Sequence, residues 1–265
     1  MVGKAKAAVA RALELDPTLG EAYSALGTFQ FAFDWDFEGA ERSFHRALEL
    51  NPNYALAHSW YGAQLAVLGR FDEAIEQGRT ARLLSPLTPI DLINLGVWHH
   101  FAGDDERAIA LLEQAIEHFP TFVESYQPLG MILCEHGEFE RGIALLEKVH
   151  EMDGRLAPLI YGHGLAGNTE EARRLLAELA ERAQTTFVSP LDFALAHVSL
   201  GEHDQAMALL ERAYEFRLPP LLFSGVYPPF APLRSDPRFV DLLRRMGLPV
   251  PPQQTAGIRP SAGPS

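Results

Sequence analysis

The chain has 265 residues, of which 47% are hydrophobic and 22% charged, with 35 acidic side chains against 22 basic ones. The net charge of −13 argues against a nucleic-acid partner, because binding to phosphates needs clustered Lys and Arg. One cysteine, Cys134, excludes an internal disulfide or thiolate metal site, and no run approaches the roughly 18 apolar residues of a membrane span. The sequence therefore predicts a cytoplasmic protein without membrane contact.

Several residue types recur at one spacing through the N-terminal half of the chain. The series are Pro17, Pro52, Pro86 and Pro120; Ala12, Ala47, Ala81 and Ala115; Gly27, Gly62, Gly96 and Gly130; and Gly69, Gly103 and Gly137. The separation is 34 residues, apart from 35 between the first two members of the proline, the alanine and the Gly27 series, and the additional residue lies in the stretch Ala32–Phe44. Such a period is the signature of a repeat architecture.

Each unit predicts two helices. Apolar residues at i, i+3, i+4 and i+7 form a stripe on the first helix, as in Tyr126, Leu129, Gly130 and Leu133. Glycines of the last series end that helix in the left-handed conformation, and proline closes the second helix.

In chain order, a lone second helix at Lys4 to Pro17 precedes units at 20–52, 53–86, 87–120 and 121–154. A degenerate unit at 155–184, with a first helix about four residues short, and another at 185–217 follow. We expect residues 218–248 to run extended through their prolines and then to form a capping helix, with Asp236 as its cap, Pro237 at its first position and Gly247 at its end. Residues 249–265 are predicted to be a disordered tail. The fold class is all-α, an α-α superhelix of about six helix-turn-helix repeats with a C-terminal capping helix.

This pattern resembles the tetratricopeptide repeat (TPR), with matching residues Tyr23, Leu26, Gly27, Ala40, Phe44, Ala47 and Pro52 in the first full unit. The phrases DWDFEGAERSFHRALELNPNYALAHSWYG, LLSPLTPIDLINLG and PLRSDPRFVDLLRRMGLP resemble more narrowly the C-terminal TPR regions of bacterial multidomain signalling proteins. In those proteins the array follows a winged-helix DNA-binding, serine/threonine kinase or nucleotidyl cyclase domain. The resemblance implies a partner-binding or sensory appendage. No effector motif is present, so the chain either begins here naturally or is a piece of a longer one.

Candidate chemical residues favour structural roles. We interpret Asp34 and Asp36 as an inter-helix corner, with Asp36 capping the next helix and Trp35 covering the corner. Adjacent residues His99 and His100 point about 100 degrees apart on a helix and cannot chelate one ion. Cys134 lacks a base on its own helix face. We therefore expect no enzyme activity, no metal and no cofactor.

Function is expected on the concave face, which the first helices line. The residues predicted to contact a partner are Thr28, Phe31, Leu56, Trp60, Ala63, Ile90, Asn94, Val97, His100, Phe101 and Met131. The leading hypothesis is a non-enzymatic scaffold that binds a peptide or protein segment. The second is a sensory or regulatory module of a larger signalling protein. The oligomeric state stays open.

Overall fold

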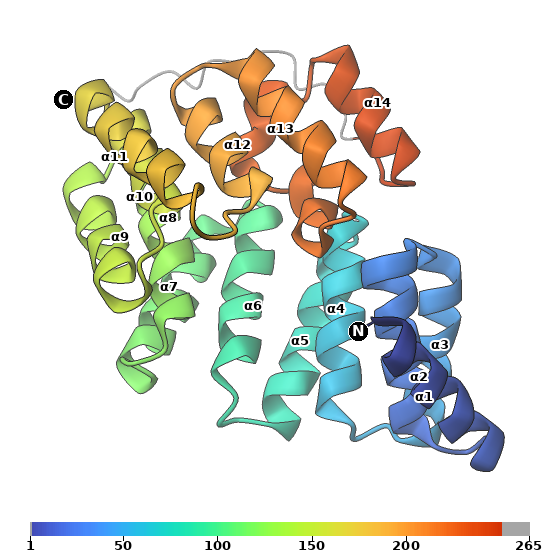
Figure 1. Cartoon of the computed structure of the whole chain (residues 1–265). Coiled ribbons are helices and arrows are strands. Elements are labelled where there is room, and N and C mark those ends of the chain that lie inside the picture. The colour runs from blue at the N-terminus through green and yellow to red at the C-terminus, as the bar shows by residue number, and fades with distance from the viewer. Residues whose placement is uncertain (1, 251–265) are drawn as a thin grey trace.

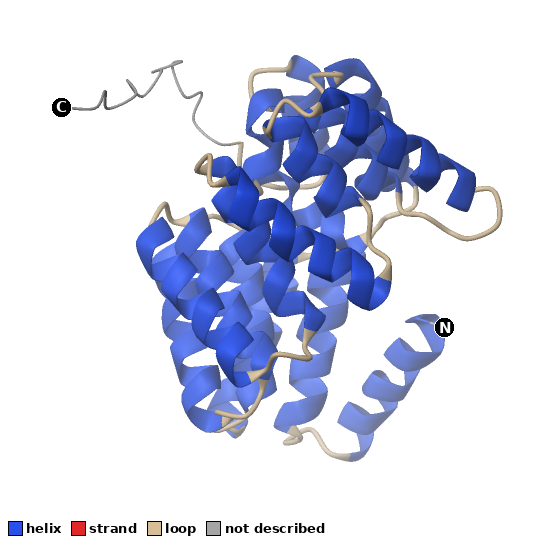
Figure 2. Cartoon of the chain, turned by 90° about the vertical axis from the view of Figure 1, so that its left-hand side faces the viewer, coloured by secondary structure: helices blue, strands red, loops and turns tan. Residues whose placement is uncertain are grey.

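The computed structural model describes residues 2–250, and within them it contains helices and no strand (Figure 2). Successive helices pair and stack side by side into a superhelix (Figure 1), which confirms the predicted fold class. No helix in this range is both long and apolar enough to cross a membrane. The predicted disordered tail lies, from residue 251 onward, outside the described residues.

The α-helices are α1 (Val2–Leu15), α2 (Gly20–Phe29), α3 (Phe37–Leu50), α4 (Ala55–Val67), α5 (Phe71–Leu84), α6 (Pro89–Phe101), α7 (Asp105–His118), α8 (Tyr126–Glu135), α9 (Phe139–Asp153), α10 (Ala157–Leu165), α11 (Thr169–Arg182), α12 (Pro190–Ser199), α13 (His203–Glu215) and α14 (Pro237–Arg245). Short elements are η1 (Gln30–Asp34), η2 (Val123–Ser125), η3 (Pro219–Gly225) and η4 (Pro228–Leu233).

Small residues at the repeated positions let neighbouring helices approach closely. The repeated alanines of the second helices, such as Ala47, Ala81 and Ala115, are completely buried. Trp98 on α6 is buried against two glycines, because a Cβ at Gly62 would lie 2.4 Å from its ring and one at Gly78 2.7 Å. The glycines thus make room for the large ring that joins the second and third units.

Three of the corners between paired helices are built alike. Gly69, Gly103 and Gly137 follow the first helices with φ of 74°, 84° and 82°, as the sequence predicts. Only glycine adopts this left-handed conformation at little cost.

The first corner differs from these three. Here α2 continues into η1, a π-helical turn that accommodates the additional residue. The amide of Asp36 donates to the carbonyl of Gln30, six residues back, whereas the amide of Arg70 reaches back five, to Leu65. Trp35, with φ of 60°, takes the place of the glycine. The break in register therefore lies in the last turn of the first helix.

The degenerate unit and the fourth unit show how sequence shortens a helix. As predicted, α10 is short, with 9 residues against 13 in α4. In the fourth unit, the first helix starts with the 3₁₀ turn η2, and Pro128 follows in the first turn of α8. Proline has no N–H to donate to the carbonyl four residues earlier, that of Glu124, so the α-helical pattern starts late.

The expectation that residues 218–235 run extended is wrong. This segment forms η3 and η4, each of which begins with a pair of prolines. Proline fixes φ near −65°, a value that suits a 3₁₀ turn as well as extended chain. The capping helix α14 is confirmed. At its start Asp236 accepts a hydrogen bond from the amide of Arg238, and after its end Gly247 has φ of 73°.

The C-terminal elements return to the first unit. The ring of Trp35 lies 5.5 Å from that of Tyr214, and the Arg217 guanidinium lies 4.6 Å from the Trp35 ring. Arg217 also donates to the Phe33 carbonyl at 3.2 Å. In Figure 1, α13 and α14 accordingly lie on the same side of the molecule as α3 and α4. The apolar residues of η3, η4 and α14 join those of η1 and α4 in one core cluster.

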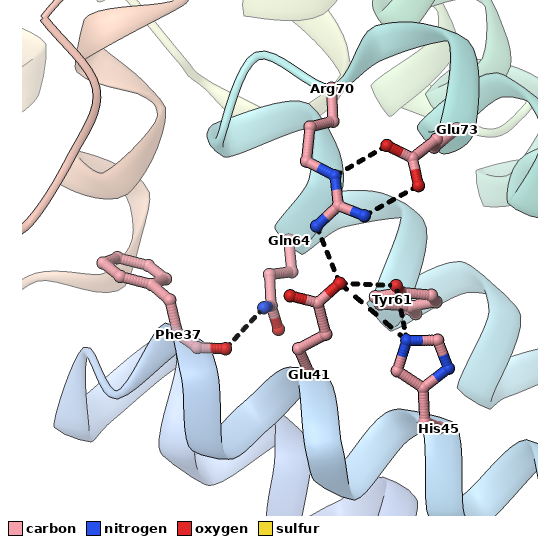
Figure 3. Close-up of polar contacts among 7 residues, drawn as sticks. All are labelled: Phe37, Glu41, His45, Tyr61, Gln64, Arg70 and Glu73. Atoms are coloured by element: carbon pink, nitrogen blue, oxygen red, sulfur yellow. Dashed lines mark hydrogen bonds and ion pairs between the residues drawn. The ribbon is translucent and has the colours of Figure 1, made fainter.

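A polar network joins the first and second units (Figure 3). Glu41 accepts from the Tyr61 hydroxyl at 2.8 Å and from Arg70 at 2.7 Å, and Arg70 also holds Glu73 through two bonds. Although partial burial opposes it, these hydrogen bonds from Arg70 and Tyr61 lower the pKa of Glu41. The buried Gln64 donates to the Phe37 carbonyl at 2.8 Å.

Candidate partner-binding groove

The concave face encloses a hollow between the first helices of the units and the returning C-terminal segment. Its larger part, which we call the central cavity, has a volume of about 510 Å³. The first helices contribute Ala63, Asn94, Val97 and Phe101, and the C-terminal segment contributes Phe223 and Tyr227. The wall is mainly apolar, as in most ligand sites.

Three predicted residues are exposed and are not part of the cavity lining. Leu56, Trp60 and Ile90 lie on the first two turns of α4 and α6. Trp60 precedes Ala63 by three residues and Ile90 precedes Asn94 by four, so each lies one turn before a cavity residue on the same helix face. We call these three residues the rim; by this spacing the rim lies on the same helix faces as Ala63 and Asn94 of the central cavity.

The structure buries two other predicted residues and partly buries a third. Phe31 is only 2% exposed, because it packs in the core cluster that the C-terminal segment covers. Met131 is also buried, and the Tyr227 hydroxyl donates to its sulfur at 3.3 Å. Thr28 is half-buried and uses its hydroxyl on the Ser24 carbonyl. The expectation of an open groove along every unit is therefore corrected: the C-terminal segment covers its first unit and part of its fourth.

Tyr227 divides the hollow. A smaller side cavity of about 240 Å³ shares Val97, Phe101 and Tyr227 with the central cavity, and His100 and Met131 line it as well. Burial raises the pKa of the Tyr227 phenol, which stays neutral.

His100 holds four helices together beside the side cavity. Its Nδ1 lies 2.6 Å from an Asp105 carboxylate oxygen and its Nε2 lies 3.2 Å from Glu135. Tyr161 donates to Glu135 at 3.0 Å, and His136 lies 2.8 Å from Asp105. Although burial opposes it, the two carboxylates Glu135 and Asp105 raise the pKa of His100. Both ring nitrogens are engaged, so neither is free to act as a general base.

Sequence reasoning missed the charged residues of the central cavity. Arg155 donates to Gln127 at 2.8 Å and pairs with Glu124 at 3.4 Å. Asp192 also lines the cavity and has no ion pair with any other described residue. Burial raises the pKa of the Asp192 carboxyl. These residues belong to the degenerate unit and its neighbours, where the repeat pattern no longer assigns a position to the groove.

The remaining candidates have structural partners. Asp36 caps α3 by accepting from the Gly39 amide at 2.9 Å, and Asp34 pairs with Lys6. Burial raises the pKa of the Cys134 thiol to about 11, which leaves it protonated and unreactive. Among residues 2–250, no group of three or more His, Cys, Asp or Glu side chains is arranged to hold a metal.

Several histidines instead join a first helix to its second helix. His99 contacts Asp104 at 3.0 Å, and His197 contacts Glu202 at 2.6 Å. Each partner lies five residues after the histidine and at the N-terminal cap of the following helix. The constant spacing of five residues could have revealed this role from the sequence.

Models of the tetratricopeptide repeat match residues 36–87 and 92–118. A curated relative, the BBSome complex member BBS4 of Bos taurus, is 24% identical over 226 residues, which are 82% of this chain and 43% of that protein. The chain thus spans less than half the length of this relative.

Solved structures share the fold. The Cut9–Hcn1 structure of the APC/C has a TM-score of 0.59 and 16% identity, covering 93% of this chain and 46% of that one. The pilus biogenesis factor PilW has a TM-score of 0.56 and 18% identity, covering 78% and 98%. YrrB, described as a TPR protein with an unusual peptide-binding site, has a TM-score of 0.50 and 20% identity, covering 77% and 98%. Together with the repeat spacing and the glycine corners, these matches show that the chain contains tetratricopeptide repeats and has the fold of a TPR solenoid.

Proposed function

We propose that this protein is a non-enzymatic scaffold that holds a peptide or protein segment against the rim and in the central cavity. The observation that supports the proposal is that exposed apolar side chains on the first two turns of α4 and α6 precede residues of an apolar cavity on the same helix faces. TPR proteins generally bind other proteins, and concave solenoid faces suit extended ligands.

Trp60 is the expected anchor of the partner. The residue is 37% exposed, so it offers apolar area to a ligand. Tryptophan is enriched among the residues that dominate binding energy. Leu56 and Ile90 beside it would exclude water from the contact.

Asn94 and Asp192 give the cavity its polar recognition. The amide of Asn94 makes no hydrogen bond with any other described residue, so it is available to the backbone of a bound segment. The carboxyl of Asp192 is half-buried and has no ion-pair partner in the described chain, so it favours a hydrogen-bond donor or a cation.

The test is Trp60→Glu, with Leu15→Glu as the matched control. Leu15 is also exposed, but it lies at the end of α1, outside the rim and the lining of the central cavity. Proteins captured by each variant from native lysate are identified, and the bound segment is then titrated as a synthetic peptide. We expect Trp60→Glu to reduce the binding free energy of this peptide by about 2 kcal/mol or more, which is roughly thirtyfold in affinity. Leu15→Glu should leave the affinity unchanged.

Circular dichroism and thermal melting of both variants separate loss of binding from loss of fold. Equal peptide affinity in the Trp60→Glu variant and the wild type would contradict the assignment of the groove.

A second role is supported by the phrases around Trp35 and Asp236, which resemble TPR regions of bacterial signalling proteins. In that role the groove would receive a regulatory ligand or an effector domain of the same polypeptide. An in-frame kinase, cyclase or winged-helix segment in the gene would favour this role over an independent scaffold.

A further inference from the structure

The outer face carries a second groove, formed by the helices that face away from the concave side. It lies between α5 and α7 and has α6, which is between them in Figure 1, as its floor. Its volume is about 540 Å³. We call it the outer groove, and it is lined by Arg79, Arg82, Leu83, Pro86, Leu95, His99, Arg107, Leu111 and Gln114.

The charge of this groove is opposite to that of the chain. The protein has 35 acidic and 22 basic side chains, yet the lining contains three arginines and one histidine and no acid. Arg82 and Arg107 form no ion pair with any other residue of the described range 2–250, and Arg79 has only a long contact of 3.6 Å with Glu76. Positive charge is therefore concentrated and largely uncompensated here.

Helix stability does not account for Arg107. This residue lies in the first turn of α7, where the amide of its own backbone is bound by the cap Asp104. The N-terminal end of a helix carries a partial positive charge, so a cation there is unfavourable. Arg82, in contrast, lies in the last turn of α5 and suits that helix.

Apolar surface accompanies the arginines. Leu83 lines the groove and is 81% exposed, although a leucine side chain gains from burial. Leu95 and Leu111 form the deeper part of the lining. The groove thus offers a place for an aliphatic side chain between guanidinium groups, which bind carboxylates through paired hydrogen bonds.

We propose that the outer groove binds an acidic segment of a partner protein, in which carboxylate side chains flank a leucine-sized apolar residue. The carboxylates pair with Arg82 and Arg107, and the apolar residue packs against Leu83 and Leu111. The site is separate from the rim and the central cavity, so the protein would hold two partners, or two segments of one partner, on opposite faces.

Fluorescence anisotropy with a rhodamine-labelled peptide of alternating Glu-Glu-Leu blocks tests the proposal. We expect the wild type to bind this peptide at low ionic strength and to prefer it over a Gln-Gln-Leu peptide by roughly tenfold or more. Added salt should weaken the binding, because the arginines are exposed.

The decisive variant is Arg82→Glu combined with Arg107→Glu, and its matched control is Arg42→Glu combined with Arg244→Glu. All four arginines are on helix surfaces, and both pairs change the net charge by the same amount. The first double variant should bind the acidic peptide roughly tenfold or more weakly than the wild type, and the second should bind it with unchanged affinity. Leu83→Ser should weaken binding without affecting the fold.

Equal losses in the two pairs would show an effect of net charge only and overturn the proposal. Absence of a preference for the acidic peptide in the wild type would overturn it as well. Trp60→Glu, which alters the rim, should leave this binding intact, so failure of either site is distinguishable from failure of the other.

Discussion

The first corner, between η1 and α3, and the third corner, between α6 and α7, reverse the direction of the chain in two different ways. At the third corner Gly103 takes the left-handed conformation, and His99 and His100 tie α6 to Asp104 and Asp105 at the start of α7. All of these contacts are within six residues. At the first corner Trp35 takes that conformation despite its side chain, and its contacts are with Tyr214 and Arg217, far along the chain.

The difference shows where each corner obtains its stability. The glycine and the two links to Asp104 and Asp105 are local, so the third corner can be repeated along a solenoid, and Glu135 in addition joins His100 to the next unit. The first corner is complete only when the C-terminal segment lies against it, because a left-handed tryptophan costs about 1–2 kcal/mol that its packing must offset. An irregular corner therefore marks the place where the superhelix meets its own end.

Substitution of Trp35 gives the largest expected effect on this comparison. Trp35→Ala removes the packing against Tyr214 and Arg217 but keeps the backbone cost, and we expect a loss of about 2–3 kcal/mol in the free energy of unfolding, since the ring is half-buried. Trp35→Gly removes the same packing and relieves the backbone, so it should be about 1 kcal/mol less harmful. Urea unfolding measures both.

Gly103→Ala is the control at the regular corner. It adds a Cβ into open space, so its only cost is the backbone conformation, and we expect a loss of about 1 kcal/mol. If Trp35→Ala, which keeps the backbone cost, were as stable as the wild type, the contacts with the C-terminal segment would contribute nothing, and the contrast between the corners would fail.

Between pH 6 and pH 9, a change of pH should alter the stability that the third corner contributes and not that of the first corner. The pKa of His100 is raised in the folded state, so its stabilising charge is fully present below the unfolded value near 6.5 and is lost as pH rises through the folded value. We expect the free energy of unfolding to fall between pH 6 and pH 9 more steeply in the wild type than in His100→Gln. Equal slopes in the two proteins would contradict a charged His100 between Asp105 and Glu135.

Periodic features of the fold could be predicted because each has a local cause. The glycine corners, the helix cap at Asp236 and the short α10 follow from backbone preferences within a few residues. The 3₁₀ turns η3 and η4 were missed because proline permits both conformations, and packing on the first unit decides between them. The return of the chain to Trp35 depends on the summed rotation of all units, which no local pattern contains.

The candidate groove was predictable only in its middle. Residues such as Ala63, Asn94 and Phe101 follow from the repeat register and do line the central cavity. Phe31 was predicted in the groove by the same register, but it is covered by a segment about 190 residues later in the chain. Arg155 and Asp192 lie outside the regular units, so the register could not place them.

A double-mutant cycle between Trp35 and Tyr214 tests the closure of the superhelix most directly. Unfolding free energies of Trp35→Ala, Tyr214→Ala and the double variant give the coupling energy, with Trp35→Ala and the exposed Phe187→Ala as an additive control pair. Rings 5.5 Å apart predict a coupling of about 0.5–1.5 kcal/mol. A coupling of zero, equal to that of the control pair, would contradict the contact between the first corner and the C-terminal segment.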